Sequence, residues 1–231
     1  MAALVALIST AAGHASRVGI PALPSVYTAA DELSEAPSDP LAPFRLSLGS
    51  SISALKKVAS VDVQGYLRAK DDVYLHVALP SSTEAASLLP CELGIDVLDG
   101  DFFYQNGSQL MEATFLARDL RGNEHAIDAL QRTFGKPDFE VVLPGALNLV
   151  IGFRTRDGFL LCTFDDLPFF RISAFRNDPQ DLMAGSQMLL FEGLSDYSQR
   201  LERGESQNSL IQALMSVVTQ AGMARSLLKP M

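Results

Sequence analysis

The sequence predicts an α+β fold: an antiparallel sheet of about six to eight strands, two short helices on one face of it, and a helical C-terminal tail. Three observations lead to this prediction. Runs of alternating apolar and polar residues occur in pairs around turn sequences. Two short stretches have apolar residues at the spacings of three and four that define one face of a helix. The tail has few β-branched runs, and its apolar residues recur with a helical period.

Composition excludes several classes of protein. The chain has 231 residues, of which 48% are hydrophobic and 19% charged, so it is neither disordered nor of low complexity. Its 27 acidic residues outnumber 18 Lys and Arg, and the net charge of −9 argues against binding nucleic acid or an anionic membrane surface. No apolar run approaches the roughly 18 residues that cross a bilayer. Two cysteines, Cys91 and Cys162, exclude a disulfide framework and leave a single disulfide open.

The N-terminal residues 1–43 are predicted to form an Ala/Pro-rich arm or linker. Five prolines fall between Pro21 and Pro43, without sustained periodicity. The first residues combine an apolar run with small residues at Gly13 and Ala15, a pattern typical of a signal-peptide cleavage site. The basic region that precedes such a run is missing, and Arg17 follows it. We therefore expect a cytoplasmic protein, and a periplasmic or secreted one if residues 1–15 are a cleaved signal.

Residues 44–176 are predicted to form one α+β domain built from two similar units. The first unit begins with a short helix carrying Ile52, Leu55 and Val58 on one face. VDVQGYLRA and VYLHVAL form a hairpin, and ELGIDV, DFFYQ and SQLMEATFLA supply further strands. The last two join around Asn106-Gly107, the dipeptide that most favours a tight hairpin turn.

The second unit repeats this order. Asn123 is the expected N-cap of a helix that carries Leu130 and Phe134 and stops at Gly135 and Pro137. FEVVL, ALNLVIGFR, FLLCTF and LPFFRISAF follow as strands. Two such units would each expose one apolar sheet face, so their sheets could merge.

The C-terminal region, residues 177–231, is predicted to contain two or three helices with breaks near Gly193 and Gly204. The last helix has an apolar face broader than a lone surface helix requires. The sheet, a second copy in a homodimer or a protein partner must cover it. The partner-binding residues predicted on this face are Ile211, Leu214, Met215 and Val218.

The search for catalytic, cofactor and metal motifs is negative. No histidine stands at a metal-ligand spacing from another His or Cys, and no phosphate-binding loop or nucleophile elbow is present. We therefore predict no catalytic residues, no cofactor and no metal. The alternative is a hydrolase whose site is assembled from scattered residues, with His76 or His125 as the base and an Asp from 96–101 as its partner.

Five carboxylates are predicted to lie in turns or at strand ends. If the two sheets merge, these turns can gather at one edge and form a negative patch that speeds the association of a basic partner. The second set of predicted partner-binding residues is therefore Asp96, Asp99, Asp101, Asp165 and Asp166.

The order of elements over residues 50–228 and the acidic composition resemble the class I type III secretion chaperones, the Tir-chaperone-like family of bacterial secretion. CELGIDV, SQLMEATFLA, EHAIDALQRTF, LNLVIGFR and FLLCTFDDL carry this resemblance. It implies a small acidic dimer that holds a partly unfolded protein partner on apolar patches, without catalytic residues. The family members are shorter and lack an arm like residues 1–43. The helix ending FGKPD is also similar to small α+β toxin-immunity and inhibitor proteins.

These observations together favour a non-catalytic protein-binding module, chaperone- or adaptor-like, that captures a protein partner on apolar faces. A toxin-immunity or inhibitor protein is the first alternative, and the hydrolase is the second.

Overall fold

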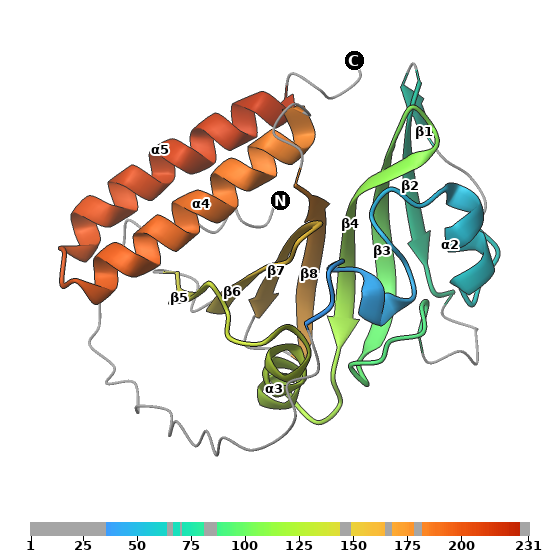
Figure 1. The fold of residues 1–231 in the computed structure, drawn as a ribbon, viewed down its shortest axis with the longest axis horizontal. Helices are drawn as coiled ribbons and strands as arrows, with labels where there is room; N and C mark the ends of the chain where they lie inside the picture. Colours follow the sequence, from blue (N-terminus) through green and yellow to red (C-terminus); the bar gives the residue numbers. More distant parts are fainter. Residues whose placement is uncertain are drawn as a thin grey trace.

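The computed structural model describes residues 36–63, 67–69, 71–80, 87–143, 149–164, 168–177 and 182–226. These residues form an α+β fold with a helical C-terminal region, as the sequence predicts (Figure 1). In chain order the elements are η1 (Ala42–Phe44), α2 (Ile52–Val58), β1 (Leu67–Ala69), β2 (Asp72–Ala78), β3 (Asp96–Gln105), β4 (Gln109–Arg118), α3 (Asn123–Phe134), β5 (Phe139–Val142), β6 (Leu149–Arg154), β7 (Gly158–Phe164), β8 (Phe169–Arg176), α4 (Leu182–Glu202) and α5 (Gln207–Ser226).

The strands form one eight-stranded sheet in the order β1-β2-β3-β4-β8-β7-β6-β5. Every neighbouring pair is antiparallel. Each half of the sheet is a meander of four consecutive strands, preceded by one short helix, α2 or α3. The two meanders meet where β4 pairs with β8. The two units inferred from the sequence correspond to these halves, and their sheets merge.

The β3–β4 hairpin has the turn that its sequence predicts, lengthened by one residue. Gln105 pairs with Gln109, so the connection comprises residues 106–108. Asn106 and Gly107 have φ values of 50° and 63°. Asn and Gly tolerate positive φ better than other residues, which explains why this dipeptide stands here.

The first face of the sheet is covered by the two short helices, as predicted. Leu55 of α2 and Leu130 of α3 belong to one continuous buried cluster with the inward residues of all strands from β2 to β4 and β6 to β8. Leu41 and Phe44 are fully buried in the same cluster. The Asp39 carboxylate fixes this segment, because it accepts hydrogen bonds from the backbone N–H groups of Leu41 and Leu48, each at 2.8 Å. The final residues of the predicted arm thus pack into the core.

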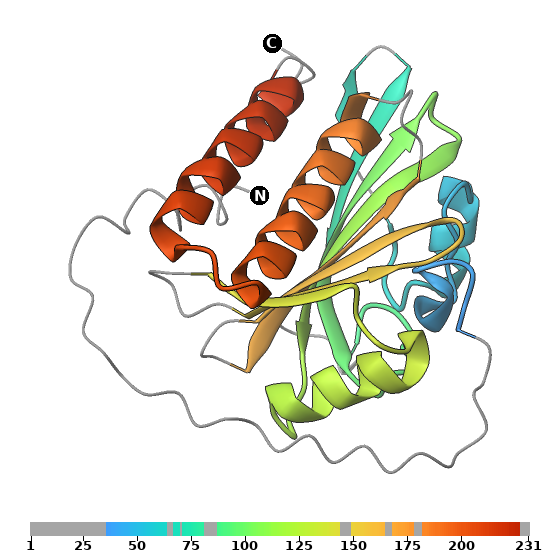
Figure 2. The same ribbon diagram turned by 60° about the vertical axis from the view of Figure 1, so that its left-hand side comes forward.

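The second face is partly covered by α4 and α5, which lie side by side (Figure 2). α4 crosses the strands: Gln187 donates a hydrogen bond to Glu112 on β4, and Phe191 packs against Phe139 on β5 and Phe159 on β7. α5 packs on α4, and residues of both helices share a second buried cluster with β5, β6, β7 and β8. The helical C-terminal region is therefore part of the folded body.

One predicted helix break is wrong. Gly193 lies inside α4, whereas Gly204, with a φ of +81°, lies between α4 and α5 as expected. A Cβ atom on Gly193 would come within 2.6 Å of Val217 Cγ1 on α5. The glycine therefore permits close approach of two helices and does not end one.

Replacing Gly193 by alanine should lower the free energy of unfolding by about 1–3 kcal/mol, because the methyl group overpacks the α4–α5 contact. The higher helix propensity of alanine, about 1 kcal/mol, opposes this loss. Adding Val217→Ala should recover much of the loss in the double variant, as measured by urea unfolding. A Gly193→Ala protein more stable than wild type would contradict the close-packing role.

Candidate functional site

Part of the second face lies beside the area that α4 covers, and we call it the open strip. It comprises two cross-strand rows on β2, β3, β4 and β8. Every member is exposed or half-buried, whereas Phe103, Glu112 and Phe175 in the adjoining row are buried. The first row is His76, Asp101, Thr114 and Ser173, and the second is Ala78, Asp99, Leu116 and Arg171.

The polar side chains of the first row are hydrogen-bonded in pairs. His76 Nδ1 lies 2.8 Å from Asp101 Oδ1, and Thr114 Oγ1 lies 3.1 Å from Ser173 Oγ. The His76–Asp101 pair is the combination named for a scattered hydrolase site. Its side chains are 63% and 65% exposed, so the pair lies on an open surface and not in an enclosed polar pocket.

In the second row, the oppositely charged residues Asp99 and Arg171 are separated by one strand. Asp99 and Arg171 are both directly opposite Leu116, one on each neighbouring strand. Adjacent strands are about 4.8 Å apart, so the backbones of Asp99 and Arg171 lie about 10 Å from each other. Neither forms an ion pair or hydrogen bond with another residue in the described part of the chain.

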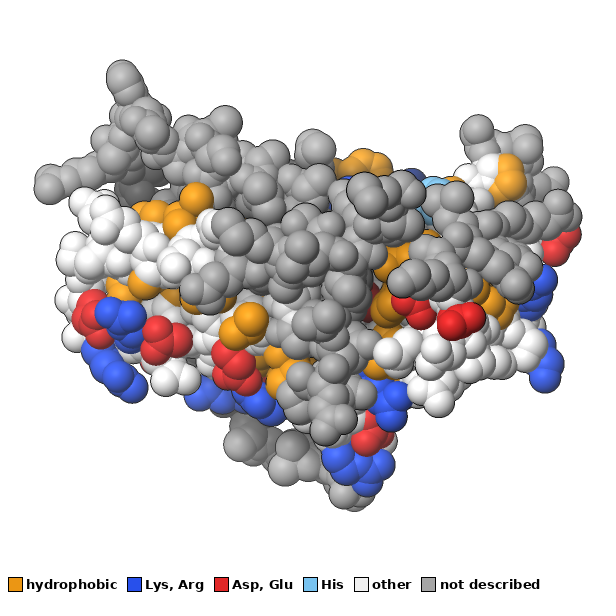
Figure 3. All heavy atoms as spheres, turned by 90° about the horizontal axis from the view of Figure 1, so that it is seen from above, with side chains coloured by type: hydrophobic (Ala, Val, Ile, Leu, Met, Phe, Trp, Pro, Cys, Tyr) orange, Lys and Arg blue, Asp and Glu red, His pale blue; other side chains and the backbone are white. Residues whose placement is uncertain are grey.

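Asp96 lies at a strand end as predicted, because it is the first residue of β3. The placement of Asp99 and Asp101 in a turn is wrong, because both lie inside that strand. Asp96 forms an ion pair with Arg118 at 3.0 Å, while Asp99 and Asp101 lie on the open strip. Asp165 and Asp166 lie outside the described residues. On the face seen in Figure 3, acidic and basic side chains are interspersed and form no patch of one sign among the described residues.

The residues predicted on the last helix lie on α5, and α4 accounts for much of their burial. Leu214 and Val218 are buried in the cluster that includes α4, and Ile211 packs against it. Ile211 and Met215 are half-buried. The main cover seen on this apolar face is another helix of the same chain, which is none of the three predicted covers (the sheet, a second copy or a protein partner).

A buried carboxylate that sequence reasoning missed lies between β4 and α3. The Asp119 side chain is 1% exposed and accepts hydrogen bonds from the backbone N–H and Nε of Arg121 and from His125 Nδ1. Arg121 also donates to the Gly94 carbonyl at 2.6 Å. Burial alone would raise the pKa of Asp119, but the hydrogen bonds from Arg121 and His125 outweigh it and lower that pKa. This cluster fixes the turn into α3, and the Asp-x-Arg spacing is its only sequence signal.

Asp119→Asn should lower the free energy of unfolding at neutral pH by about 1–3 kcal/mol, because a buried charge-assisted network is lost. The pKa of Asp119 is depressed in the folded state, so its stabilisation is fully present above the unfolded pKa of about 3.9 and declines as pH falls through the folded value. Urea unfolding from about pH 6 to about pH 2 should therefore show the two proteins converging in acid. A gap that stays constant over this range would contradict the role of the charge.

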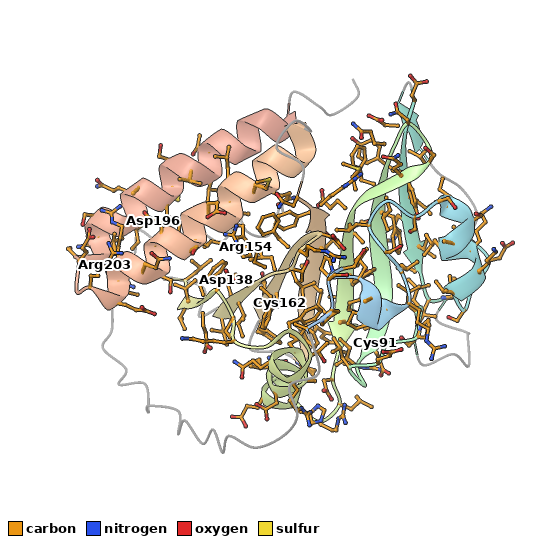
Figure 4. All side chains as sticks on the ribbon, in the orientation of Figure 1. Cys91, Asp138, Arg154, Cys162, Asp196 and Arg203 are labelled. Carbon is orange, nitrogen blue, oxygen red and sulfur yellow. The ribbon has the colours of Figure 1, made fainter. Side chains whose placement is uncertain are left out.

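The cysteines do not form a disulfide. Cys162 lies in the core strand β7 and Cys91 in the segment before β3, as Figure 4 shows. Burial raises the pKa of the Cys91 thiol to about 11, so it is a poor nucleophile near neutral pH. Among the described residues no group of three His, Cys, Asp or Glu side chains is placed to hold a metal ion. No helix in the described ranges is long and apolar enough to cross a bilayer.

Comparison with known proteins adds no assignment. No family model, no curated protein and no solved structure matches this chain.

Proposed function

We propose that the chain is a non-catalytic protein-binding module, chaperone- or adaptor-like, and that the open strip is its binding surface. The observation that carries this proposal is the uneven covering of the second face. α4 packs on β5, β7 and β8, whereas the eight residues of the open strip have no helix over them among the described elements. The strand pairing of an antiparallel sheet fixes the backbone of this face before a partner arrives, which lowers the entropic cost of binding.

The chemistry of the strip also favours a protein partner. It combines an apolar side chain, Leu116, with hydroxyls and with charges of both signs. Interfaces of non-obligate complexes have this mixed character and are no more apolar than the rest of the surface. The partner predicted from the sequence was basic or partly unfolded; the strip supports a partner that also carries acidic groups, since Arg171 lies beside Leu116. A toxin-immunity or inhibitor role would use the same kind of surface.

The test is capture of partners from an extract of the organism that makes the protein, with quantitative comparison of matched variants. Leu116→Arg places a bulky charge at the centre of the strip and should remove any specific partner. Asp128→Arg changes an exposed residue on α3, away from the strip, and should keep it. Cross-linking at Thr114 then identifies the partner segment. Equal recovery by both variants would refute the strip as the binding surface.

The His76–Asp101 hydrogen bond favours one second candidate, a hydrolase. A carboxylate at Nδ1 orients the imidazole and leaves Nε2 free to accept a proton. In that case His76→Gln should remove turnover of a panel of ester and peptide substrates, and binding of a partner should be unaffected. Identical rates for wild type and variant would exclude this pair as a catalytic base.

A further inference from the structure

The geometry of the second row points to a particular kind of partner. We infer that the open strip binds an α-helix of the partner protein that lies across β3, β4 and β8. The helix carries a basic, an apolar and an acidic side chain one turn apart. They lie over Asp99, Leu116 and Arg171, respectively. The inference rests on the proposed function and specifies the structure and chemistry of the partner.

The first reason is the contrast between the two rows. In the first row each polar side chain has a hydrogen-bond partner on the neighbouring strand. In the second row the charges of Asp99 and Arg171 are left without a partner in the described part of the chain, one on each side of a half-buried leucine. Among the described residues, the second row is therefore the part of the strip whose charges are available to a partner.

The second reason is spacing. The three side chains follow one another across strands at intervals of about 4.8 Å. A helix rises about 5.4 Å per turn, and side chains three and four residues apart share one face. An extended peptide repeats a side chain on the same face only every 6.6 Å or so, and so matches the row less well.

The third reason is that the chain already binds a helix in this way. α4 crosses the same face of the sheet, from Gln187 over Glu112 on β4 to Phe191 against Phe139 on the edge strand β5. The α4 side of the face is apolar, at Phe159, Leu161 and Phe175. The strip differs because it carries charged side chains, which suits a partner helix that is soluble by itself and binds reversibly.

The experiment uses the full chain and synthetic helices as probes. The test probe is an alanine-rich helical peptide with Lys, Leu and Glu at one-turn spacing on one face. Two control probes have Lys-Leu-Lys and Glu-Leu-Glu on the same scaffold. Backbone amide NMR titrations report both the site and the affinity. We expect shifts confined to β3, β4 and β8, and binding of the Lys-Leu-Glu probe about fivefold tighter than that of either control.

Charge reversals test the order of the charges. Asp99→Lys and Arg171→Glu should each weaken binding of the Lys-Leu-Glu probe about fivefold. The double variant should restore it to within about twofold, because the helix can bind in the opposite direction. Asp128→Lys and Arg132→Glu on α3 are matched controls and should have no effect. Equal binding of the three probes, shifts outside the strip, or a double variant as weak as the single ones would each overturn the inference.

The outcome is distinguishable from failure of the proposed function. If Leu116→Arg abolishes capture of the native partner while the Lys-Leu-Glu probe does not bind, the strip binds a protein of different structure. If Leu116→Arg leaves capture unchanged, the proposed function itself fails, whatever the probes do.

Discussion

Phe191→Ala should lower the free energy of unfolding by about 3–5 kcal/mol, among the largest effects expected for any single substitution in this chain. The side chain is fully buried between α4 and the sheet. Its ring centroid lies 4.8 Å from that of Phe159, 5.0 Å from that of Phe139 and 6.4 Å from that of Phe175. Alanine would leave a cavity among three aromatic rings, and the surrounding strands can close it only in part.

The measurement is urea unfolding monitored by circular dichroism. Leu189→Ala, two residues away on the exposed side of α4, is the control and should change stability by less than about 0.5 kcal/mol. A loss below about 1 kcal/mol for Phe191→Ala would mean that α4 is not anchored by this ring.

Phe134→Ala should have an effect of the same size, about 3–5 kcal/mol, on the opposite face of the sheet. Phe134 is the last residue of α3 and 7% exposed, and its ring centroid lies 5.6 Å from that of Phe153 on β6. The ring therefore anchors the C-terminal end of α3 to the sheet, in keeping with its place on the apolar face of the predicted helix.

Thermal unfolding of Phe134→Ala should be compared with that of Leu120→Ala. Leu120 lies just before α3 and is 78% exposed, so its truncation should be nearly neutral. Similar losses for the two variants would show that α3 is held by something other than the Phe134 ring.

Local sequence signals predicted most of the elements. The hairpins of each half are formed by segments adjacent in the chain, so alternation and turn residues such as Asn106-Gly107 were sufficient to place them. Asn123, the predicted N-cap, is instead the first residue of α3, and Gly122 is the N-cap. The helix therefore begins one residue earlier than predicted, and it ends at Phe134 as expected. The apolar face expected on each of the two units allowed their sheets to merge, and the structure has a single sheet.

Two errors have one cause: a residue with a strong local preference is overruled by its neighbours in space. The Asp-rich stretch around Gly100 has the composition of a turn. The stretch fits a strand because Gly100 leaves room for the rings of Phe102 and Phe115; a Cβ atom on Gly100 would come within 2.8 Å of the Phe102 ring. Asp99 and Asp101 also fit the strand, because they lie on the open face of the sheet. Gly193 stands inside a helix because Val217 on α5 occupies the space that a side chain at this position would need.

The candidate site was predictable only in part. The sequence indicated His76, Asp99 and Asp101 as candidate site residues, but it did not indicate Arg171 or Leu116. Their juxtaposition depends on the register between β4 and β8, in which Thr114 meets a residue 59 positions later, Ser173. No local pattern encodes a register between segments so far apart.

The joining of two meanders at β4 and β8 has a consequence for how the chain folds. Within each half, strands pair with neighbours in sequence, so few residues need to be ordered before contacts form. The β4–β8 pair closes a loop of more than fifty residues, so its formation costs more chain entropy than that of any other strand pair in the sheet. We expect the hairpins to form early and the seam between the halves to form late. Pulse-labelled hydrogen exchange during refolding should then show amides of the β3–β4 and β6–β7 hairpins protected before those that bridge β4 and β8.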